Sequence, residues 1–254
     1  MINFPVLRTQ RLTVQLKELS IGAACQIAAM PTHAEQASNT AFLRHAIDTV
    51  SNGPTDPAQW TVQERIMATC HYMASTLEDG PNFGVGAGHY GDYLDGASND
   101  AAALESVDVG ELGGDVWRVR HLTGAMAESI ERMDGEVGGV SGYLHWVLAG
   151  MALQMTLADG EDGMPQEGTA LDNHLAEKMR VIAAYPESDF IALRAMYEQG
   201  RNKLHHLLRI TFSRDKAAPG VVVLPQGGAA LPPARFPTHS CISGMAREMV
   251  GGAG

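Results

Sequence analysis

The chain has 254 residues, of which 45% are hydrophobic and 19% charged, a composition typical of a folded protein with a substantial core. Its 29 acidic and 18 basic residues give a formal net charge of −11. Because nucleic-acid binding relies on Lys and Arg meeting phosphates, and no Lys/Arg-rich run is present, this balance argues against nucleic-acid partners and against an anionic membrane surface.

The cysteines and the apolar stretches indicate in which compartment we expect the protein and whether we expect it to span a membrane. Cys25, Cys70 and Cys241 are odd in number and far apart, which is not the pattern of a disulfide framework and favours a reducing compartment. Residues 1–7 contain no charged region followed by an apolar run, so we expect no signal peptide. The longest apolar stretch, Tyr143–Ala158, is too short to span a bilayer and is interpreted as a buried core helix.

The first elements are predicted from alternation and capping. Apolar and polar residues alternate from Leu12 to Leu19, which predicts a half-buried strand. Ser20 then caps a short helix that runs through Met30 and is terminated by a proline. A second helix is expected over about residues 33–50.

A third helix and a hairpin are expected next. Asp56-Pro57, an N-cap followed by proline at the first helical position, predicts a helix that ends at Asp79-Gly80-Pro81. The glycine-rich residues 81–103 are expected to form a loop. Leu104–Val109 and Val116–Val119 then predict two short strands of a hairpin.

The second half of the chain reads as mainly helical. We expect a helix from Thr123 to Met133 and a long core helix from about Ser141. The acidic residues 159–163 are expected to form a solvated linker. Helices are predicted over Asp172–Ala184 and Ser188–Phe212, where apolar residues recur at helical spacing.

Beyond Ser213 the character of the sequence changes. Val221–Leu224 predicts one strand and 243–250 a short last helix, but Gly and Pro residues between them favour an extended arm. The sequence therefore predicts an α+β fold that is mainly helical, with a small N-terminal strand, a short β-hairpin and an extended C-terminal arm. The expected division is a body over 1–213, with a possible lobe boundary near 160, and an arm over 214–254.

One short pattern resembles a dinucleotide-binding loop. Gly86-Ala87-Gly88-His89-Tyr90-Gly91 satisfies the G-x-G-x-x-G spacing. That spacing serves pyrophosphate only when a buried strand precedes it and a helix follows, so that backbone N–H groups face the ligand. Residues 79–83 cannot form such a strand, so a glycine-rich surface loop is the favoured interpretation and no cofactor is expected.

The sequence contains no local motif for metal ligation or for nucleophilic catalysis. The closest-spaced candidate ligands are Cys70-His71, His205-His206, and His239 with Cys241, but neighbours on a helix point about 100° apart and none has the spacing of a metal motif. The acidic residues 159–163 fail the calcium-loop pattern. Neither Ser141 nor Ser240 lies in a nucleophile elbow. We therefore assign no catalytic, cofactor-binding or metal residue.

Several methionines fall on the predicted helices. Such residues most often fill gaps in a core, although methionine-rich faces also serve as adaptable protein-binding surfaces. We favour core filling for Met67, Met73, Met126, Met133, Met151 and Met155.

The opening segment resembles that of a known group of proteins. Leu12-Thr13-Val14-Gln15-Leu16-Lys17-Glu18-Leu19-Ser20-Ile21-Gly22 is similar to the start of tail-assembly and baseplate proteins of tailed bacteriophages. Residues 60–65 and 143–154 are similar in character, and together these segments cover about a fifth of the chain. The resemblance implies a virion or tail component that works through protein–protein contacts without a cofactor.

The leading hypothesis is therefore a non-enzymatic structural or assembly protein of a phage tail or baseplate, found in the virion and assembled in the host cytoplasm. Its partners would be other protein chains, in a homo- or hetero-oligomer, and the arm would extend onto another subunit. The alternatives are a cytosolic hydrolase or transferase with His89, Asp92 and Tyr93 beside the 84–96 loop, and a monomeric chaperone absent from the mature particle.

Overall fold

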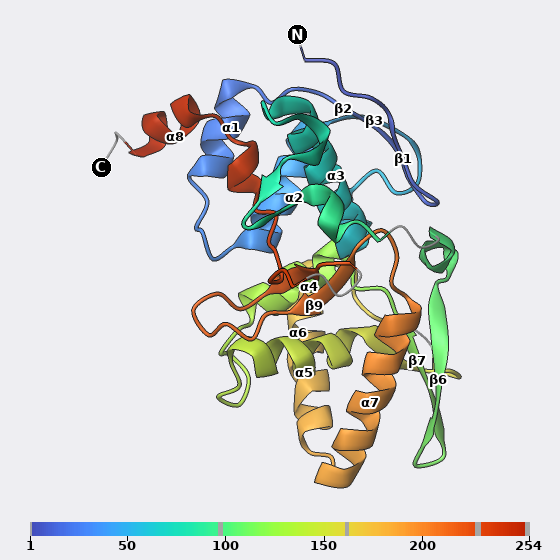
Figure 1. Ribbon diagram of the computed structural model, residues 1–254. Helices are drawn as coiled ribbons and strands as arrows, with labels where there is room; N and C mark the ends of the chain where they lie inside the picture. Colours follow the sequence, from blue (N-terminus) through green and yellow to red (C-terminus); the bar gives the residue numbers. More distant parts are fainter. Residues whose placement is uncertain (1, 96–98, 161–162, 227–229, 252–254) are drawn as a thin grey trace. The chain divides into compact units, whose positions relative to one another are not determined.

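The computed structural model describes residues 2–95, 99–160, 163–226 and 230–251. Helices account for 48% of the described residues and the strands among them form only small sheets, so the fold class is α+β and mainly helical, as the sequence predicts (Figure 1). The small N-terminal sheet and the β-hairpin are both present.

The chain forms two compact units, and each is described by itself. Unit 1 contains residues 1–99, 207–211 and 222–254, and unit 2 contains residues 100–206 and 212–221. This grouping differs from the expected division near residue 160 and at 213. The first boundary lies just before the hairpin, and the C-terminal residues return to the N-terminal unit because their apolar side chains are buried there.

Unit 1 begins with a small antiparallel sheet in the order β1-β2-β3, made of Leu7–Arg8, Thr13–Leu16 and Ile47–Asn52. The predicted strand is β2, whose alternating Val14 and Leu16 are buried. The second helix, α2, covers Glu35–Ala46 and ends earlier than expected. The residues after it include Ile47, Thr49 and Val50, whose β-branched side chains suit a strand, and they pair with β2.

Two other helices of unit 1 start at their capping residues. Helix α1 covers Ile21–Ala28, and the Ser20 side chain accepts a hydrogen bond from Ala23 N. Asp56 caps only a 3₁₀ turn, η1 (Pro57–Gln59). Helix α3, Val62–Thr76, starts instead at a capping box in which Thr61 and Glu64 exchange side-chain-to-backbone hydrogen bonds.

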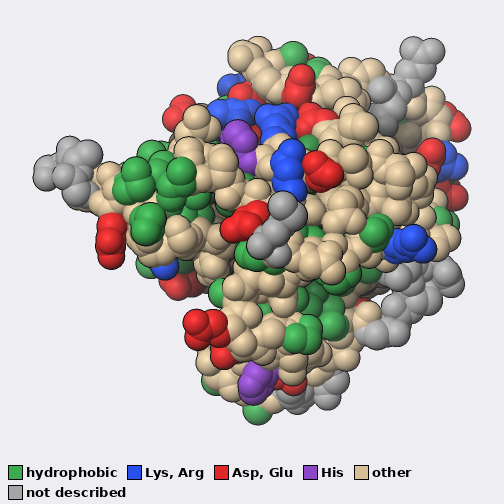
Figure 2. Space-filling view, turned by 90° about the horizontal axis from the view of Figure 1, so that it is seen from above, with side chains coloured by type: hydrophobic (Ala, Val, Ile, Leu, Met, Phe, Trp, Pro, Cys, Tyr) green, Lys and Arg blue, Asp and Glu red, His purple; other side chains and the backbone are tan. Residues whose placement is uncertain are grey.

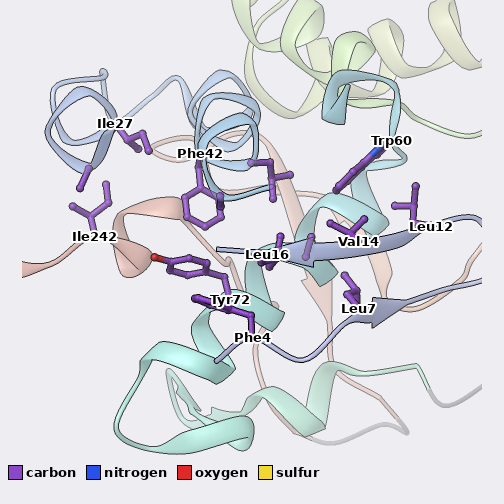
Figure 3. Packing of buried hydrophobic residues seen from close by; sticks show 14 of the residues in the cluster. Phe4, Leu7, Leu12, Val14, Leu16, Ile27, Phe42, Trp60, Tyr72 and Ile242 are labelled. Carbon is purple, nitrogen blue, oxygen red and sulfur yellow. The ribbon is translucent and has the colours of Figure 1, made fainter. Parts of the chain in front are cut away.

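The core of unit 1 joins the chain's two ends (Figure 3). Phe4 stacks on Tyr72 with ring centroids 5.0 Å apart, and Phe42 meets Tyr72 edge-on at 5.0 Å. Ile27 from α1 and Ile242 from the C-terminal residues lie in the same buried cluster. The C-terminal residues therefore contribute to the core on which the N-terminal sheet packs.

The remaining elements of unit 1 are short. They are η2 (Gly80–Asn82), β4 (Gly84–Val85), β5 (Gly88–His89), η3 (Tyr90–Tyr93), η5 (Thr238–Cys241) and α8 (Gly244–Gly251). The β4–β5 pair lies within the glycine loop, and α8 is the predicted last helix, which packs beside α1 (Figure 1).

Unit 2 begins within η4 (Asn99–Ala103) and contains a second antiparallel sheet, in the order β6-β7-β8. These strands are Ser106–Leu112, Asp115–Arg120 and Met155–Leu157. Gly113 and Gly114 turn the β6–β7 hairpin with φ angles of 66° and 92°, which only glycine adopts without strain at both central positions.

Four helices complete unit 2: α4 (Gly124–Arg132), α5 (Gly142–Gln154), α6 (Gly168–Ala183) and α7 (Glu187–Lys203). Helices α4, α5 and α6 pack together, and α7 packs on β6 and β7. The helix expected over Ser188–Phe212 ends at Lys203. Arg209–Phe212 forms β9 instead, because it pairs with the predicted strand Val221–Leu224, β10. Most residues of these two strands belong to unit 1.

Candidate interaction site

The contact between α1 and α8 positions the most exposed apolar side chains of unit 1. Ala246 on α8 is fully buried, and its carbonyl oxygen lies 3.9 Å from the Cys25 Sγ on α1. The Ser243 hydroxyl accepts a hydrogen bond from Ala246 N and so caps the start of α8. Ile242, immediately before this cap, is buried in the core, so α8 is fixed at its N-terminal end.

The exposed side of the same helix pair carries three large apolar side chains. Met245 is 67% exposed and Met249 is 58% exposed, and residues four apart on a helix share a face. Ile21, in the first turn of α1, is 48% exposed. Figure 2 shows hydrophobic side chains gathered over α8. We call Ile21, Met245 and Met249 the α1–α8 apolar surface.

This surface has the chemistry of a protein contact. Burying one such side chain fully contributes about 1.5–3 kcal/mol. Methionine is unbranched and adapts its shape to the surface that covers it. The methionines singled out from the sequence are different, because all six are buried or half-buried: Met67, Met73, Met126, Met133, Met151 and Met155. The available signal was the i, i+4 spacing of Met245 and Met249 within the predicted last helix.

The glycine loop does not direct its polar side chains toward one point. The Asp92 carboxylate accepts a hydrogen bond from His89 N at 2.8 Å. Tyr93 is buried, and its hydroxyl donates to Pro232 O at 2.9 Å. His89 itself is exposed. The dinucleotide pattern of 86–91 lies on β5 and a 3₁₀ turn, so its described part has neither the long strand nor the helix N-terminus that pyrophosphate binding needs.

The adjacent candidate metal ligands of unit 1, Cys70 and His71, make different contacts. His71 Nε2 lies 2.7 Å from Pro5 O, whereas Cys70 is fully buried. Burial raises the pKa of the Cys70 thiol well above its ordinary value, and the nearby Cys241 adds to this. Burial also raises the pKa of Cys241, in the same 3₁₀ turn as His239 and Ser240. Protonated thiols are poor ligands and poor nucleophiles.

Of the adjacent histidines of unit 2, His206 is buried against another histidine. The His206 ring meets His121 edge-on with centroids 4.8 Å apart, and its Nδ1 lies 2.9 Å from Leu204 O. Across the described ranges, no group of three or more His, Cys, Asp or Glu side chains is arranged to hold a metal ion. Ser141 is the N-cap residue of α5. The acidic segment 159–163 lies partly outside the described residues.

Comparison with protein-family models, curated proteins and solved structures gives no match for this chain. Within the part of the chain that the structure describes, no helix is both long and apolar enough to cross a membrane.

Proposed function

We propose that the chain is a non-enzymatic structural or assembly protein of a phage tail or baseplate, and that it acts by binding other protein chains. The class comes from the resemblance of residues 12–22 to tail-assembly and baseplate proteins. The observation that carries the mode of action is the α1–α8 apolar surface, because three large apolar side chains stand on one helix pair whose inner face is already packed.

In this mechanism a neighbouring chain covers Met245 and Met249 and removes them from water. The gain is the hydrophobic free energy of the covered area, less the cost of association. The formal charge of −11 adds long-range repulsion between chains of the same sign, so apolar contacts must supply the attraction. The protein would be assembled into the virion in the host cytoplasm.

The test is a pair of charge substitutions on the apolar surface. In the M245E/M249E variant, two carboxylates would have to be buried on contact, so we expect association to weaken at least tenfold. The measurement is native mass by light scattering across a concentration series, together with the fraction of the chain that sediments with purified tail particles. The matched control is I191E, which changes a 60% exposed side chain on α7 in unit 2 and should leave both readings unchanged.

A wild-type chain that is monomeric at every concentration and absent from tail particles and their precursors would overturn the proposal. A chain found with precursors but missing from mature particles would be an assembly chaperone. The enzyme alternative has no supporting observation in the glycine loop, since Asp92 and Tyr93 are engaged in contacts within unit 1.

A further inference from the structure

The bend after β3 contains Asn52-Gly53, the only Asn-Gly pair in the sequence. Asn52 is the last residue of β3, and Gly53 leaves the strand with a φ angle of 94°. Both residues are exposed. Because glycine has no Cβ, its backbone nitrogen approaches the preceding side chain more easily than that of any other residue.

Few hydrogen bonds hold the polar groups of this pair. Asn52 Nδ2 donates to Arg11 O, and the length of 3.3 Å marks a weak contact. Among the described residues, no hydrogen bond is found for the Gly53 N–H. The carboxamide and the backbone nitrogen that follows it are therefore both in contact with water, and few contacts oppose their approach.

These two groups are the reactants of asparagine deamidation. The Gly53 nitrogen attacks Asn52 Cγ, and the new N–C bond closes a five-membered succinimide ring. The amide nitrogen of Asn52 leaves as ammonia, taking the proton of the Gly53 N–H. Water then opens the ring and gives aspartate when the new N–C bond breaks, or isoaspartate when the original peptide bond breaks. The net reaction consumes one water, releases one ammonia and needs no oxidant or reductant.

We propose that Asn52-Gly53 is a site of spontaneous deamidation in the folded chain, with water as the co-reactant. Each modified molecule gains one negative charge at the end of β3, and most of the product carries the isoaspartyl linkage. The inference goes beyond the proposed function and does not depend on it, because the reaction needs no partner chain.

The surroundings of Gly53 do not accommodate the isoaspartyl product. A Cβ at Gly53 would lie 2.5 Å from both Arg11 O and Leu12 Cδ2, so the backbone packs directly on these residues. Asn52 pairs with β2, and the carbonyl of the proline after Gly53 accepts a hydrogen bond from Trp60 Nε1 at 2.7 Å. Isoaspartate adds one methylene to the backbone between these two fixed points. The modification therefore displaces the bend from Leu12, which is fully buried in the core of unit 1.

The test is a time course of the folded, full-length chain at mildly alkaline pH, read by peptide mass spectrometry with electron-transfer fragmentation to distinguish isoaspartate from aspartate. We expect Asn52 to deamidate faster than Asn202 by about tenfold or more. Asn202 is an internal control, because it is also exposed but lies in α7 before Lys203, whose side chain hinders the attack. The N52Q variant should stay unmodified at this position, since its longer side chain cannot close the five-membered ring.

A stability measurement tests the consequence for the fold. Molecules that carry isoaspartate should unfold at a lower urea concentration than unmodified molecules of the same age. The N52D variant changes only the side chain and should unfold close to the wild type.

Two results would overturn the inference. One is equal rates for Asn52 and Asn202 in the folded chain, and the other is modification of Asn52 only in a chain unfolded in guanidinium chloride. An isoaspartyl form with an unchanged urea midpoint would overturn the consequence drawn from Leu12. None of these results alters the test on Met245 and Met249.

Discussion

The two units hold their interiors together in different ways. Unit 1 buries charged and amide side chains between α2 and α3, with Arg65 only 1% exposed and Glu64 fully buried. The core of unit 2 is mostly apolar, and its main ionic contact lies at the edge, where Arg132 meets Asp172. Buried polar side chains lose their hydration and must form hydrogen bonds of fixed geometry, so the stability of unit 1 depends on the direction of these bonds. The stability of unit 2 depends instead on how closely its apolar side chains fit together.

The buried arginine shows how closely unit 1 meets this requirement. Arg65 Nη2 donates to Gln36 O at 2.6 Å and to Thr40 Oγ1 at 2.7 Å, and its Nε donates to Asn39 Oδ1 at 3.1 Å. Asn39 Nδ2 in turn donates to Thr69 Oγ1 at 2.9 Å. The Arg65 side chain on α3 therefore binds three residues of α2, and each of these acceptors would lose the arginine donor while staying buried if Arg65 were replaced.

The largest effect is expected from Arg65→Met. The substitution retains much of the side-chain volume but removes the donors from three buried acceptors, so we expect a loss of about 3–5 kcal/mol in the free energy of unfolding. Chemical denaturation measures the loss. Hydrogen exchange read on peptides of each unit should show loss of protection in unit 1.

The matched control is Arg44→Met. Arg44 also pairs from α2, with Asp56, but its side chain is 54% exposed, so a change of at most about 1 kcal/mol is expected. Equal losses for the two variants would show that burial of Arg65 does not govern the stability of unit 1.

The dependence of unit 2 on shape is tested by Gly200→Ala. A Cβ at this position of α7 would lie 2.5 Å from Val119 Cγ2 and 2.8 Å from Val109 Cγ1, on the strands that α7 covers. Both valines are stiff, so overpacking should cost about 1–3 kcal/mol. The control is Gly22→Ala in α1 of unit 1, where nothing lies within 4 Å and alanine should stabilise the helix by up to about 1 kcal/mol. Thermal denaturation of the two variants should therefore shift in opposite directions.

The sequence predicted elements where the signal is local. Ser20 and Thr123 cap helices as expected, and Gly113-Gly114 turns the expected hairpin. It did not predict β3 or β9, because short strands exist by pairing with residues distant in the chain. The two-unit grouping was not predictable for the same reason, since nothing local in the Gly/Pro-rich tail shows that it is buried in the N-terminal unit.

The candidate site was predictable only in part. The last helix was expected, and the spacing of Met245 and Met249 could be read from the sequence. The exposure of these two methionines could not be predicted, because it depends on Ala246 facing α1. The contacts of Arg235 and Phe236 bring Glu35 and Phe83 together with the C-terminal residues, and no pattern within any one of these segments indicates that arrangement.

The smallest effect is expected from the ionic contact of unit 2. Burial alone would raise the pKa of Asp172, but hydrogen bonds from Arg132 and Ser129 outweigh this and lower it. A carboxyl whose pKa is lower in the folded state contributes stability above its unfolded pKa of about 3.9, and the contribution disappears as pH falls through the folded value.

Asp172→Asn should therefore cost about 1 kcal/mol at pH 7 and progressively less below about pH 4. Urea denaturation across this range measures the difference. Asp108→Asn, which changes a 66% exposed partner of Arg118, should show almost no difference at any pH. If the two variants behaved alike, the Asp172 contact would be only a surface ion pair, and the stability of unit 2 would rest on its apolar packing alone.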